Sequence, residues 1–511
     1  MNKLKKKFYI PATDKLLIDL IAWVCAIVIM LTWRSLDNKL IIFDYAEMFL
    51  PVFLFWSVVG YLCQKYRPVK KPNFIKEIAI LISVSCIVFG LIYFGIVLNY
   101  IDFKHYSKYT AMLTVALMIL FNLLNIVIYY SYLYASNYDV SFPQIRARKE
   151  VVVMASPTKI NEQEIIEIKN TIREYTNQSS LDFIEKNIDL TSSNTKIIAT
   201  TILANIKFIR KYHYDAIVNL AKINQIRGIN RLFVMLNQKL PDNGIFCCCF
   251  ESIEQFGKSI EAKFPPVIRQ IVKIWFFIQK RVLPKMFFTN RLWFDITKGR
   301  NRVFSNVEVL GRLYYCGFEV LEEFAADNLT WIIAKRKNIP QKQTNKLYGL
   351  IIKLPRVGKN RKIVYYYKIR TMFPYSEYIQ KYIYEKQGTD EIGKVKNDIR
   401  ITRWGKVFRK LWIDELPMIF NLLKGDLKIV GVRPLSKAFF EKYPPHLQEK
   451  RTLTTPGLIP PFYVDLPKSE QEIFDSEERY LNQYLKSPLK TDIKYFFKAT
   501  YNILIKKARS H

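Results

Sequence analysis

Histidine, cysteine and acidic residues are scarce in this chain of 511 residues, and each shortage excludes a class of site. The four histidines are scattered, so neither a zinc site nor a histidine-based catalytic triad is indicated. The seven cysteines lack metal-ligand spacing, and we expect reduced, structural thiols without a disulfide framework. Only 44 acidic residues oppose 78 Lys and Arg, giving a formal charge of +34. This excess favours an anionic partner: a nucleic acid, an anionic membrane face or a phosphorylated substrate.

Long apolar stretches are plentiful at the N-terminus, at residues 15–33, 45–63, 78–98 and 109–134. Each approaches the ~20 residues needed to cross a bilayer, so we predict a bundle of four transmembrane helices over residues 1–140. Pro51 interrupts the second stretch, and no cleavage site follows the first, so we expect no removable signal peptide. Basic residues concentrate before the first stretch, between the second and third, and after the fourth. This asymmetry disfavours buried soluble helices and predicts a multi-pass membrane protein with cytoplasmic termini and soluble domains.

Residues 150–340 are predicted to form a soluble α/β domain. The pattern predicts strands at 151–154, 196–200, 216–220, 245–250, 317–323 and 329–335, and helices at 160–175 and 231–240. The later part of this succession is similar to the second half of methyltransferase-like Rossmann domains. A dinucleotide or S-adenosylmethionine site needs a glycine-rich turn, and the first strand leads into Met-Ala-Ser-Pro-Thr instead. We therefore favour a degenerate domain with a structural or regulatory role over a working methyltransferase.

An unusual segment lies inside this domain at residues 265–288. Its apolar residues recur at spacings of three and four, while Arg269, Lys273, Lys280 and Arg281 supply cationic edges. A basic amphipathic helix of this kind suits the membrane interface. An ordinary helix packed on the core fits the same pattern, and the sequence leaves both interpretations open.

Two adjacent carboxylates, Asp414 and Glu415, stand in a run otherwise crowded with Arg and Lys. Pro417 disfavours a helical conformation in the residue before it, so we expect the pair at a turn between two helices. The second helix, from Pro417 to about residue 423, would begin beside the acids. Its dipole, with Arg409 and Lys410, is expected to hold Asp414 ionised.

These two acids allow a functional and a structural interpretation. An ionised Asp414 is a usable nucleophile towards phosphorus, and Glu415 can hold a divalent cation that shields phosphate charge. Alternatively, Asp414 is only an N-cap and Glu415 a first-turn acid. Upstream, a strand at 365–370 carries Lys368 and Arg370 two residues apart, so both point the same way, which suits a diphosphate. A solvated strand face is the alternative.

Several motifs together resemble one family. Lys368-Ile-Arg-Thr-Met372, the run around the two acids and Pro456-Gly457 occur in the same order as in the catalytic domain of bacterial polyprenyl-phosphate glycosylphosphotransferases. These membrane enzymes start lipid-linked glycan and exopolysaccharide assembly. The resemblance covers about residues 349–507 and implies an α+β sugar-phosphate transferase domain over 348–511. Together with the apolar stretches and the central α/β pattern, it predicts a multi-domain membrane protein with a Rossmann-like central domain.

The resemblance also implies site roles. Asp414 would form a covalent phosphosugar–aspartyl intermediate, and Glu415 would hold Mg²⁺. The phosphate-binding residues would be Lys368, Arg370, Arg400, Arg403, Arg409 and Arg433. The implied partners are a nucleoside-diphosphate sugar, expected to be a UDP-sugar, a polyprenyl phosphate such as undecaprenyl phosphate, and the lipid bilayer. Self-association is left open.

The sequence departs from the family at three places. Val432 replaces a proline in Gly431-Val-Arg-Pro434, and the loop 456–465 lacks the usual Gln-Val-Asn-Gly-Arg segment, offering Phe462 and Tyr463 to stack on a base or sugar. The membrane-dipping helix that usually precedes the catalytic domain is missing at 336–350, where the chain is polar. These departures keep a second hypothesis open, a non-catalytic membrane scaffold of a polysaccharide-assembly complex. A membrane-tethered nucleic-acid binder is disfavoured because no nucleic-acid module is recognisable.

Overall fold

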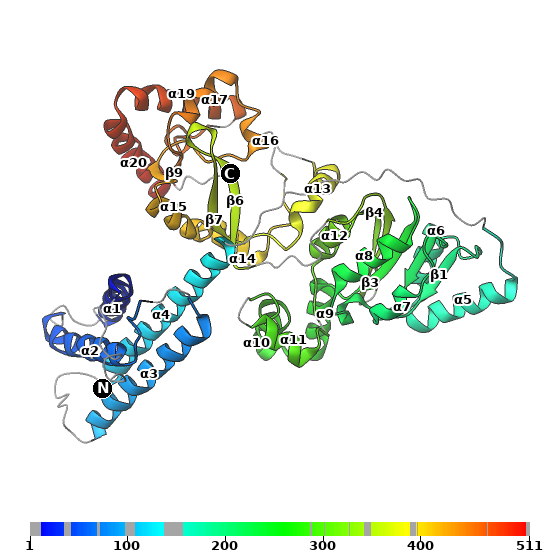
Figure 1. Ribbon diagram of the computed structural model, residues 1–511, viewed down its shortest axis with the longest axis horizontal. Helices are drawn as coiled ribbons and strands as arrows, with labels where there is room; N and C mark the ends of the chain where they lie inside the picture. The colour runs from blue at the N-terminus through cyan, green and yellow to red at the C-terminus, as the bar shows by residue number, and fades with distance from the viewer. Residues whose placement is uncertain are drawn as a thin grey trace, which may run out of the picture. The chain divides into compact units, whose positions relative to one another are not determined.

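The computed structural model describes residues 12–34, 42–68, 72–97, 108–136, 157–286, 289–300, 302–326, 328–341, 349–388, 395, 397–467 and 469–506. The chain separates into two compact units, Met1–Ser136 and Asn137–His511. Figure 1 shows helices alone in the first unit and mixed helix and sheet in the second. The second unit holds both predicted soluble domains, so their boundary stays a prediction.

The described residues of the first unit form four helices: α1 (Thr13–Arg34), α2 (Ile42–Leu62), α3 (Phe74–Val97) and α4 (Lys108–Ser136). All four predicted apolar stretches are therefore helical. Among the described residues, Phe74–Gly95 and Met112–Ser136 are long and apolar enough to cross a membrane, whereas the apolar part of α2, Leu50–Leu62, is shorter. Two of the four predicted spans thus have this support, and the four-span bundle and its orientation remain predictions.

A buried polar cluster lies inside this helical unit. Asp19 of α1 is fully buried and accepts hydrogen bonds from Lys65 at 2.6 and 2.8 Å, from Trp56 Nε1 at 3.1 Å and from the Tyr66 hydroxyl at 2.6 Å. Lys65 donates a further bond to Asn122 Oδ1 of α4 at 3.0 Å. The charge of Asp19 is therefore matched by a cation and by neutral donors, as a buried carboxylate requires.

A mixed five-stranded sheet forms the centre of the second unit, in the order β1-β2-β3-β5-β4. Its strands are β1 (Thr195–Ile198), β2 (Ala216–Asn219), β3 (Ile245–Phe250), β4 (Phe318–Ala326) and β5 (Leu329–Arg336). The first three are parallel, and β5 runs antiparallel to both of its neighbours. Five of the six predicted strands are confirmed; the strand predicted at 151–154 lies outside the described residues, and the Rossmann-like assignment stays a prediction.

Helices cover both faces of this sheet (Figure 1). Leu181 and Ile184 pack with Cys247 and Ile333 on one face, and Phe233 and other residues pack with Phe246 on the opposite face. The helices of this region are α5 (Glu162–Tyr175), α6 (Gln178–Asn187), α7 (Leu203–Lys207), η1 (Ile223–Gln225), α8 (Ile229–Lys239), α9 (Ile253–Lys263), α10 (Pro266–Phe277), η2 (Ile278–Val282), α11 (Asn290–Thr297) and α12 (Asn306–Tyr315). The predicted helices 160–175 and 231–240 correspond to α5 and α8.

Two asparagines fill the edge where the parallel strands end. Asn219 accepts from the backbone N–H of Thr200 and donates to its carbonyl, and Asn224 donates to the carbonyls of Glu251 and Arg302. In open α/β sheets this edge is the usual ligand position. Here side-chain amides tie its loops to one another, which fits the structural role predicted for the domain.

The predicted insert 265–288 forms α10 and η2. No residue of α10 is buried, an observation that favours the interface interpretation of this helix over packing in the core. Its partly covered side rests on α9, where Phe256 and Phe276 meet edge to face.

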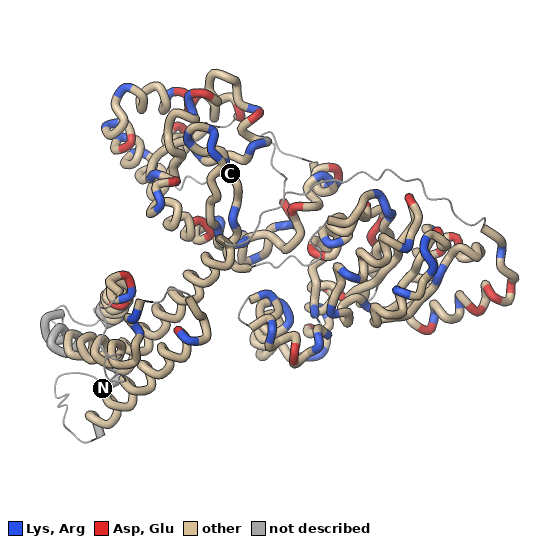
Figure 2. The backbone as a smooth tube through the Cα atoms, viewed as in Figure 1, with Lys and Arg blue, Asp and Glu red and all other residues tan. Residues whose placement is uncertain are grey.

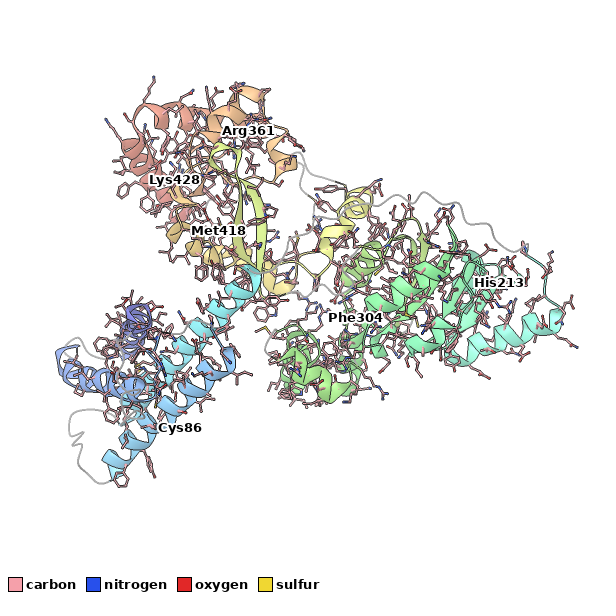
Figure 3. The ribbon with its side chains drawn as sticks, viewed as in Figure 1. Cys86, His213, Phe304, Arg361, Met418 and Lys428 are labelled. Carbon is pink, nitrogen blue, oxygen red and sulfur yellow. The ribbon has the colours of Figure 1, made fainter. Side chains whose placement is uncertain are left out.

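The remainder of the second unit starts with an antiparallel hairpin, β6 (Ile351–Val357) and β7 (Ile363–Ile369), and later adds a parallel pair, β8 (Lys428–Val430) and β9 (Gly457–Ile459). The helices are η3 (Lys359–Arg361), η4 (Ser376–Ile379), α13 (Gln380–Gln387), α14 (Arg403–Lys410), η5 (Ile413–Met418), α15 (Ile419–Leu423), α16 (Lys437–Phe440), α17 (Pro445–Thr452), α18 (Phe462–Asp465), α19 (Glu470–Lys486) and α20 (Pro488–Leu504). Lys428, labelled in Figure 3, joins β8 to α20 through an ion pair with Asp492 at 2.9 Å.

One segment of this remainder packs on the central sheet domain. The buried cluster that contains Phe233 and Leu313 also includes Tyr375, just before η4, Ile379 of η4 and Ile383 of α13. A Cβ added to Gly311 of α12 would lie 2.3 Å from the Tyr375 carbonyl oxygen, so this close approach requires glycine. The segment after β7 is thereby fixed against α12.

Candidate active site

The two predicted carboxylates lie in η5, a short 3₁₀-helix between α14 and α15. Trp412, at φ +56°, turns the chain before them, and its ring packs edge to face on Tyr463 at 5.7 Å. The expected position between two helices is confirmed. The helix expected from Pro417 instead starts as an α-helix at Ile419, because Pro417 itself falls inside the 3₁₀ turn.

Strand β7 packs beside η5 and delivers Lys368 to the acidic pair. The Lys368 ammonium lies 2.5 Å from Glu415 Oε1 and forms an ion pair with it. Burial lowers the pKa of Lys368, and Glu415 opposes that shift. The charge on Lys368 is thus held at the site by a carboxylate partner.

Asp414 is 7 % exposed, and burial raises its pKa above the usual value. Lys368 and Arg409 push the pKa down, while Glu415 pushes it up. The sequence led us to expect cations and a helix dipole to dominate. In the structure, desolvation of the carboxylate raises its pKa more than the cationic neighbours lower it, and the ionised state of Asp414 stays a prediction. A desolvated carboxylate is a stronger nucleophile once ionised, since less hydration must be removed from it.

Asn421 fixes the distance between β7 and the acids. It is fully buried, its Oδ1 accepts from Tyr367 N at 3.1 Å, and its Nδ2 donates to Tyr365 O at 2.8 Å. One side chain thereby forms hydrogen bonds with two backbone groups of β7, in the way that a neighbouring strand does. Because α15 continues directly from η5, these bonds set Lys368 opposite Glu415. The sequence analysis missed this residue, since no periodicity marks it.

A cavity of about 70 Å³ opens next to the acids. Lys368 and Glu415 line one part of it, and the others are Leu354, Arg356, Tyr366, Met418, Arg433, Pro434, Gly457, Leu458, Pro460, Phe462 and Tyr463. Met418, labelled in Figure 3, packs with Tyr366. Burial and the neighbouring Arg433 lower the pKa of Arg356 to about 10. Three cations on one small cavity make it suited to a phosphorylated ligand.

Two glycines allow the chain segments around Gly431 and Gly457, on one side of this cavity, to pack closely. A Cβ on Gly457 would lie 2.0 Å from the backbone nitrogen of Gly431, so neither position has room for a side chain. This contact places the loop after Pro456 beside Arg433, whose guanidinium lies 5.9 Å from the Phe462 ring centroid. Tyr463 is buried against Trp412, so Phe462 is the more available of the two rings predicted to stack.

The other predicted phosphate ligands are placed differently from one another. Arg409 donates through Nε to Thr371 Oγ1 at 2.9 Å and lowers the pKa of Asp414, so it belongs to the group around the acids. Arg370 donates to Gly349 O at 3.1 Å. Arg400 is buried and paired through two of its nitrogens with Asp398, an arrangement that fixes this loop. Arg403 is exposed at the start of α14. Phosphate binding by these residues stays a prediction.

An exposed apolar surface borders the acids. Its members lie on α14, η5 and α15 or directly between them, and they are Trp404, Val407, Leu411, Leu416, Ile419 and Leu423. Lys406 and Lys410 of α14 are exposed among them. We call these six residues the dyad-side apolar surface. Exposed apolar side chains beside cations suit contact with a lipid surface.

The described residues contain no group of three or more His, Cys, Asp or Glu placed to hold a metal ion. Mg²⁺ is commonly bound through one or two carboxylates together with substrate phosphates. The Glu415 carboxylate beside a cationic cavity fits that mode, and magnesium binding stays a prediction.

Residues 341–506 match the model of the family described as bacterial sugar transferase. The galactosyl transferase CpsE of Streptococcus agalactiae is 42% identical over 104 residues, 20% of this chain and 23% of that protein. An undecaprenyl-phosphate galactose phosphotransferase of Salmonella typhimurium is 41% identical over 96 residues, 17% of this chain and 20% of that protein. The chain thus spans about a fifth of each of these two relatives.

Proposed function

We propose, from the membership of residues 341–506 in the bacterial sugar transferase family, that this chain transfers a sugar 1-phosphate from a nucleoside-diphosphate sugar to a polyprenyl phosphate. This would be the first membrane step of exopolysaccharide or O-glycan assembly. The observation that carries the proposal is the buried Asp414 set between Lys368, Glu415 and Arg409, beside a cavity lined by further arginines.

Two displacements on one phosphorus describe the reaction. An oxygen of Asp414 attacks the sugar-side phosphorus, and the bond to the bridging oxygen breaks, so the nucleoside monophosphate leaves with that oxygen. An oxygen of the polyprenyl phosphate then attacks the same phosphorus, the bond to Asp414 breaks, and a polyprenyl-diphosphate sugar is released. Lys368, Arg409 and Arg433 stabilise charge on the transferring group, which is the main contribution a protein makes to phosphoryl transfer.

The donor would enter the cavity with its diphosphate on Lys368, Arg356 and Arg433. Phe462 offers a face for the nucleobase or sugar, and a UDP-sugar is the donor we propose. Mg²⁺, held by Glu415 and the diphosphate, would neutralise phosphate charge when bound. The acceptor is a lipid, and the dyad-side apolar surface is where its chain would approach Asp414.

The setting we propose is the bacterial inner membrane, crossed by α1 to α4, with both termini and the second unit in the cytoplasm. The two helices long and apolar enough to cross, and the lipid-linked substrates named for the relatives, support membrane association. The basic residues flanking the apolar stretches support the orientation.

Release of the nucleoside monophosphate tests the proposal. Purified full-length chain is incubated with undecaprenyl phosphate, Mg²⁺ and each of a panel of UDP-sugars. We expect UMP release with one or a few donors, and loss of that release in Asp414→Asn. Asp475→Asn, the same change at an exposed site on α19, is the matched control and should behave as the parent.

The alternative is a non-catalytic scaffold, favoured by the altered loop 456–465 and by the polar segment at 336–350. It predicts no UMP release from any donor. A labelled sugar donor separates the two mechanisms further. The transferase retains label on Asp414 when the acceptor is omitted, and labelling that is absent, or unchanged in Asp414→Asn, contradicts the covalent mechanism.

A further inference from the structure

Helix α10 presents an apolar row that the described residues of its own domain leave exposed. Val267, Ile271, Ile274, Trp275 and Ile278 are exposed, at spacings that place them on one side of a helix. The neighbouring α11 exposes a second pair, Leu292 and Ile296. Globular proteins seldom leave such a row in water.

Positive charge surrounds this row. Residues 257–300 contain ten Lys and Arg and only two acids, Glu261 and Asp295. Figure 2 shows these basic residues along α10 and α11. Five of the cations are exposed: Lys258, Lys263, Arg291, Lys298 and Arg300. An exposed tryptophan in an apolar row with a basic rim is the composition of a helix that lies in the headgroup region of an anionic bilayer.

The covered side of the insert is fastened to the domain by a buried ionic cluster. Glu308 of α12 is fully buried and accepts from Arg281 at 2.9 Å, Lys285 at 2.8 Å and Arg312 at 2.9 Å. Arg281 also donates to Val303 O at 2.8 Å. The direction in which the apolar row faces is thereby fixed by charge-assisted bonds.

The same cluster reaches the segment that follows β7. The Arg312 guanidinium lies 4.4 Å from the Tyr375 ring centroid, and Asn230 donates to the Tyr375 hydroxyl at 2.6 Å. Tyr375 lies four residues after Thr371, the hydrogen-bond partner of Arg409. Direct contacts therefore connect the insert, through α12, with the segment that follows β7.

We propose that the apolar row of α10 lies in the interface of an anionic lipid bilayer, as a second membrane contact separate from α1–α4. The occupant is a bilayer rather than a protein because the row is rimmed by cations and the same chain carries helices suited to a membrane. Through this contact the central domain keeps residues 341–506 close to the membrane surface, where a lipid acceptor is found.

Photocrosslinking in the full-length chain tests this proposal. A benzophenone-bearing amino acid replaces Ile271, which is 69% exposed, and in a matched variant replaces Ile166 of α5, which is 58% exposed in the same domain. Both sites are on the surface, so neither change disturbs the core. Each protein is reconstituted into vesicles of phosphatidylethanolamine and phosphatidylglycerol, illuminated and analysed for adducts by mass spectrometry.

We expect at least about tenfold more lipid adduct at position 271 than at position 166, falling when phosphatidylcholine replaces phosphatidylglycerol. Equal lipid yields at the two positions overturn the proposal. So does an adduct at position 271 with protein, whether within the chain or on a second copy. The readout is a lipid adduct and not sugar transfer, so failure here leaves the proposed reaction standing, and failure of that reaction leaves this contact standing.

Discussion

Lys368 and Glu415, 47 residues apart in the chain, form an ion pair of 2.5 Å directly beside Asp414. The two partners act on Asp414 in opposite directions: Lys368 lowers the pKa of that carboxyl, and Glu415 raises it. Burial raises the pKa further and is the largest cause. The pKa of Asp414 therefore depends on opposing effects, and single substitutions can raise or lower it.

The pH dependence of transfer should reveal this balance. Asp414 attacks when ionised, so kcat/KM falls as the pH drops through its pKa in the free enzyme. Lys368→Met removes the largest cause that lowers this pKa, so the acidic limb should move to higher pH. Glu415→Gln removes a charge that raises it, so the limb should move to lower pH. Profiles of UMP release against pH measure both midpoints.

The matched control for this pair is Lys437→Met, which removes an exposed lysine from the same part of the chain. Its midpoint should coincide with that of the parent. Rates will fall in both site variants because phosphate or metal contacts are lost as well, so the direction of the limb is the informative readout. Shifts of the same sign in Lys368→Met and Glu415→Gln would contradict Asp414 as the titrating nucleophile.

Asn421 should be required for both stability and rate. Asn421→Leu keeps the branched shape of the side chain but removes its hydrogen bonds with Tyr365 O and Tyr367 N. We expect a loss of about 1–3 kcal/mol in the free energy of unfolding, since each of the two lost bonds contributes about 0.5–1.5 kcal/mol. Denaturation curves measure that loss. Asn482→Leu, at an exposed site on α19, should change stability by less than about 0.5 kcal/mol.

The sequence predicts features that depend on neighbours along the chain. Apolar runs bounded by Pro and Gly placed β3, β5 and the helices of the first unit correctly, because periodicity and turn residues act locally. The acidic pair was also found locally, by its contrast with the cations around it.

Features that depend on distant contacts were not predictable. The pKa shift of Asp414 follows from burial against β7, and the role of Asn421 follows from two backbone groups more than 50 residues away. Gly311 has no local signal either, because its small size is required only by the approach of Tyr375. These three features depend on tertiary packing, and a single sequence does not show which segments come into contact.

Phe462 should contribute to donor binding more than to chemistry. Its ring lines the cavity near Arg433, and stacking of an aromatic side chain on a base contributes about 1–3 kcal/mol. We therefore expect Phe462→Ala to raise the donor KM about 5- to 100-fold with a much smaller change in kcat. Phe208→Ala, at a ring 83% exposed in the central domain, is the control and should leave KM unchanged. A fall in kcat at constant KM would contradict donor stacking.

The buried pair of Asp19 and Lys65 should be essential to the first unit as a pair, and not as two separate residues. Lys65→Met leaves the Asp19 carboxylate buried with only the neutral donors Trp56 and Tyr66, and removal of one partner of such a pair costs about 3–5 kcal/mol. Asp19→Asn in the same chain removes the stranded charge, so the double variant should recover most of that loss. Thermal unfolding of the three proteins in one detergent measures the coupling. Lys15→Met removes an ion pair with Glu77 that is partly exposed, and it should cost no more than about 1 kcal/mol. If the double variant is less stable than Lys65→Met alone, the two side chains do not act through their charges.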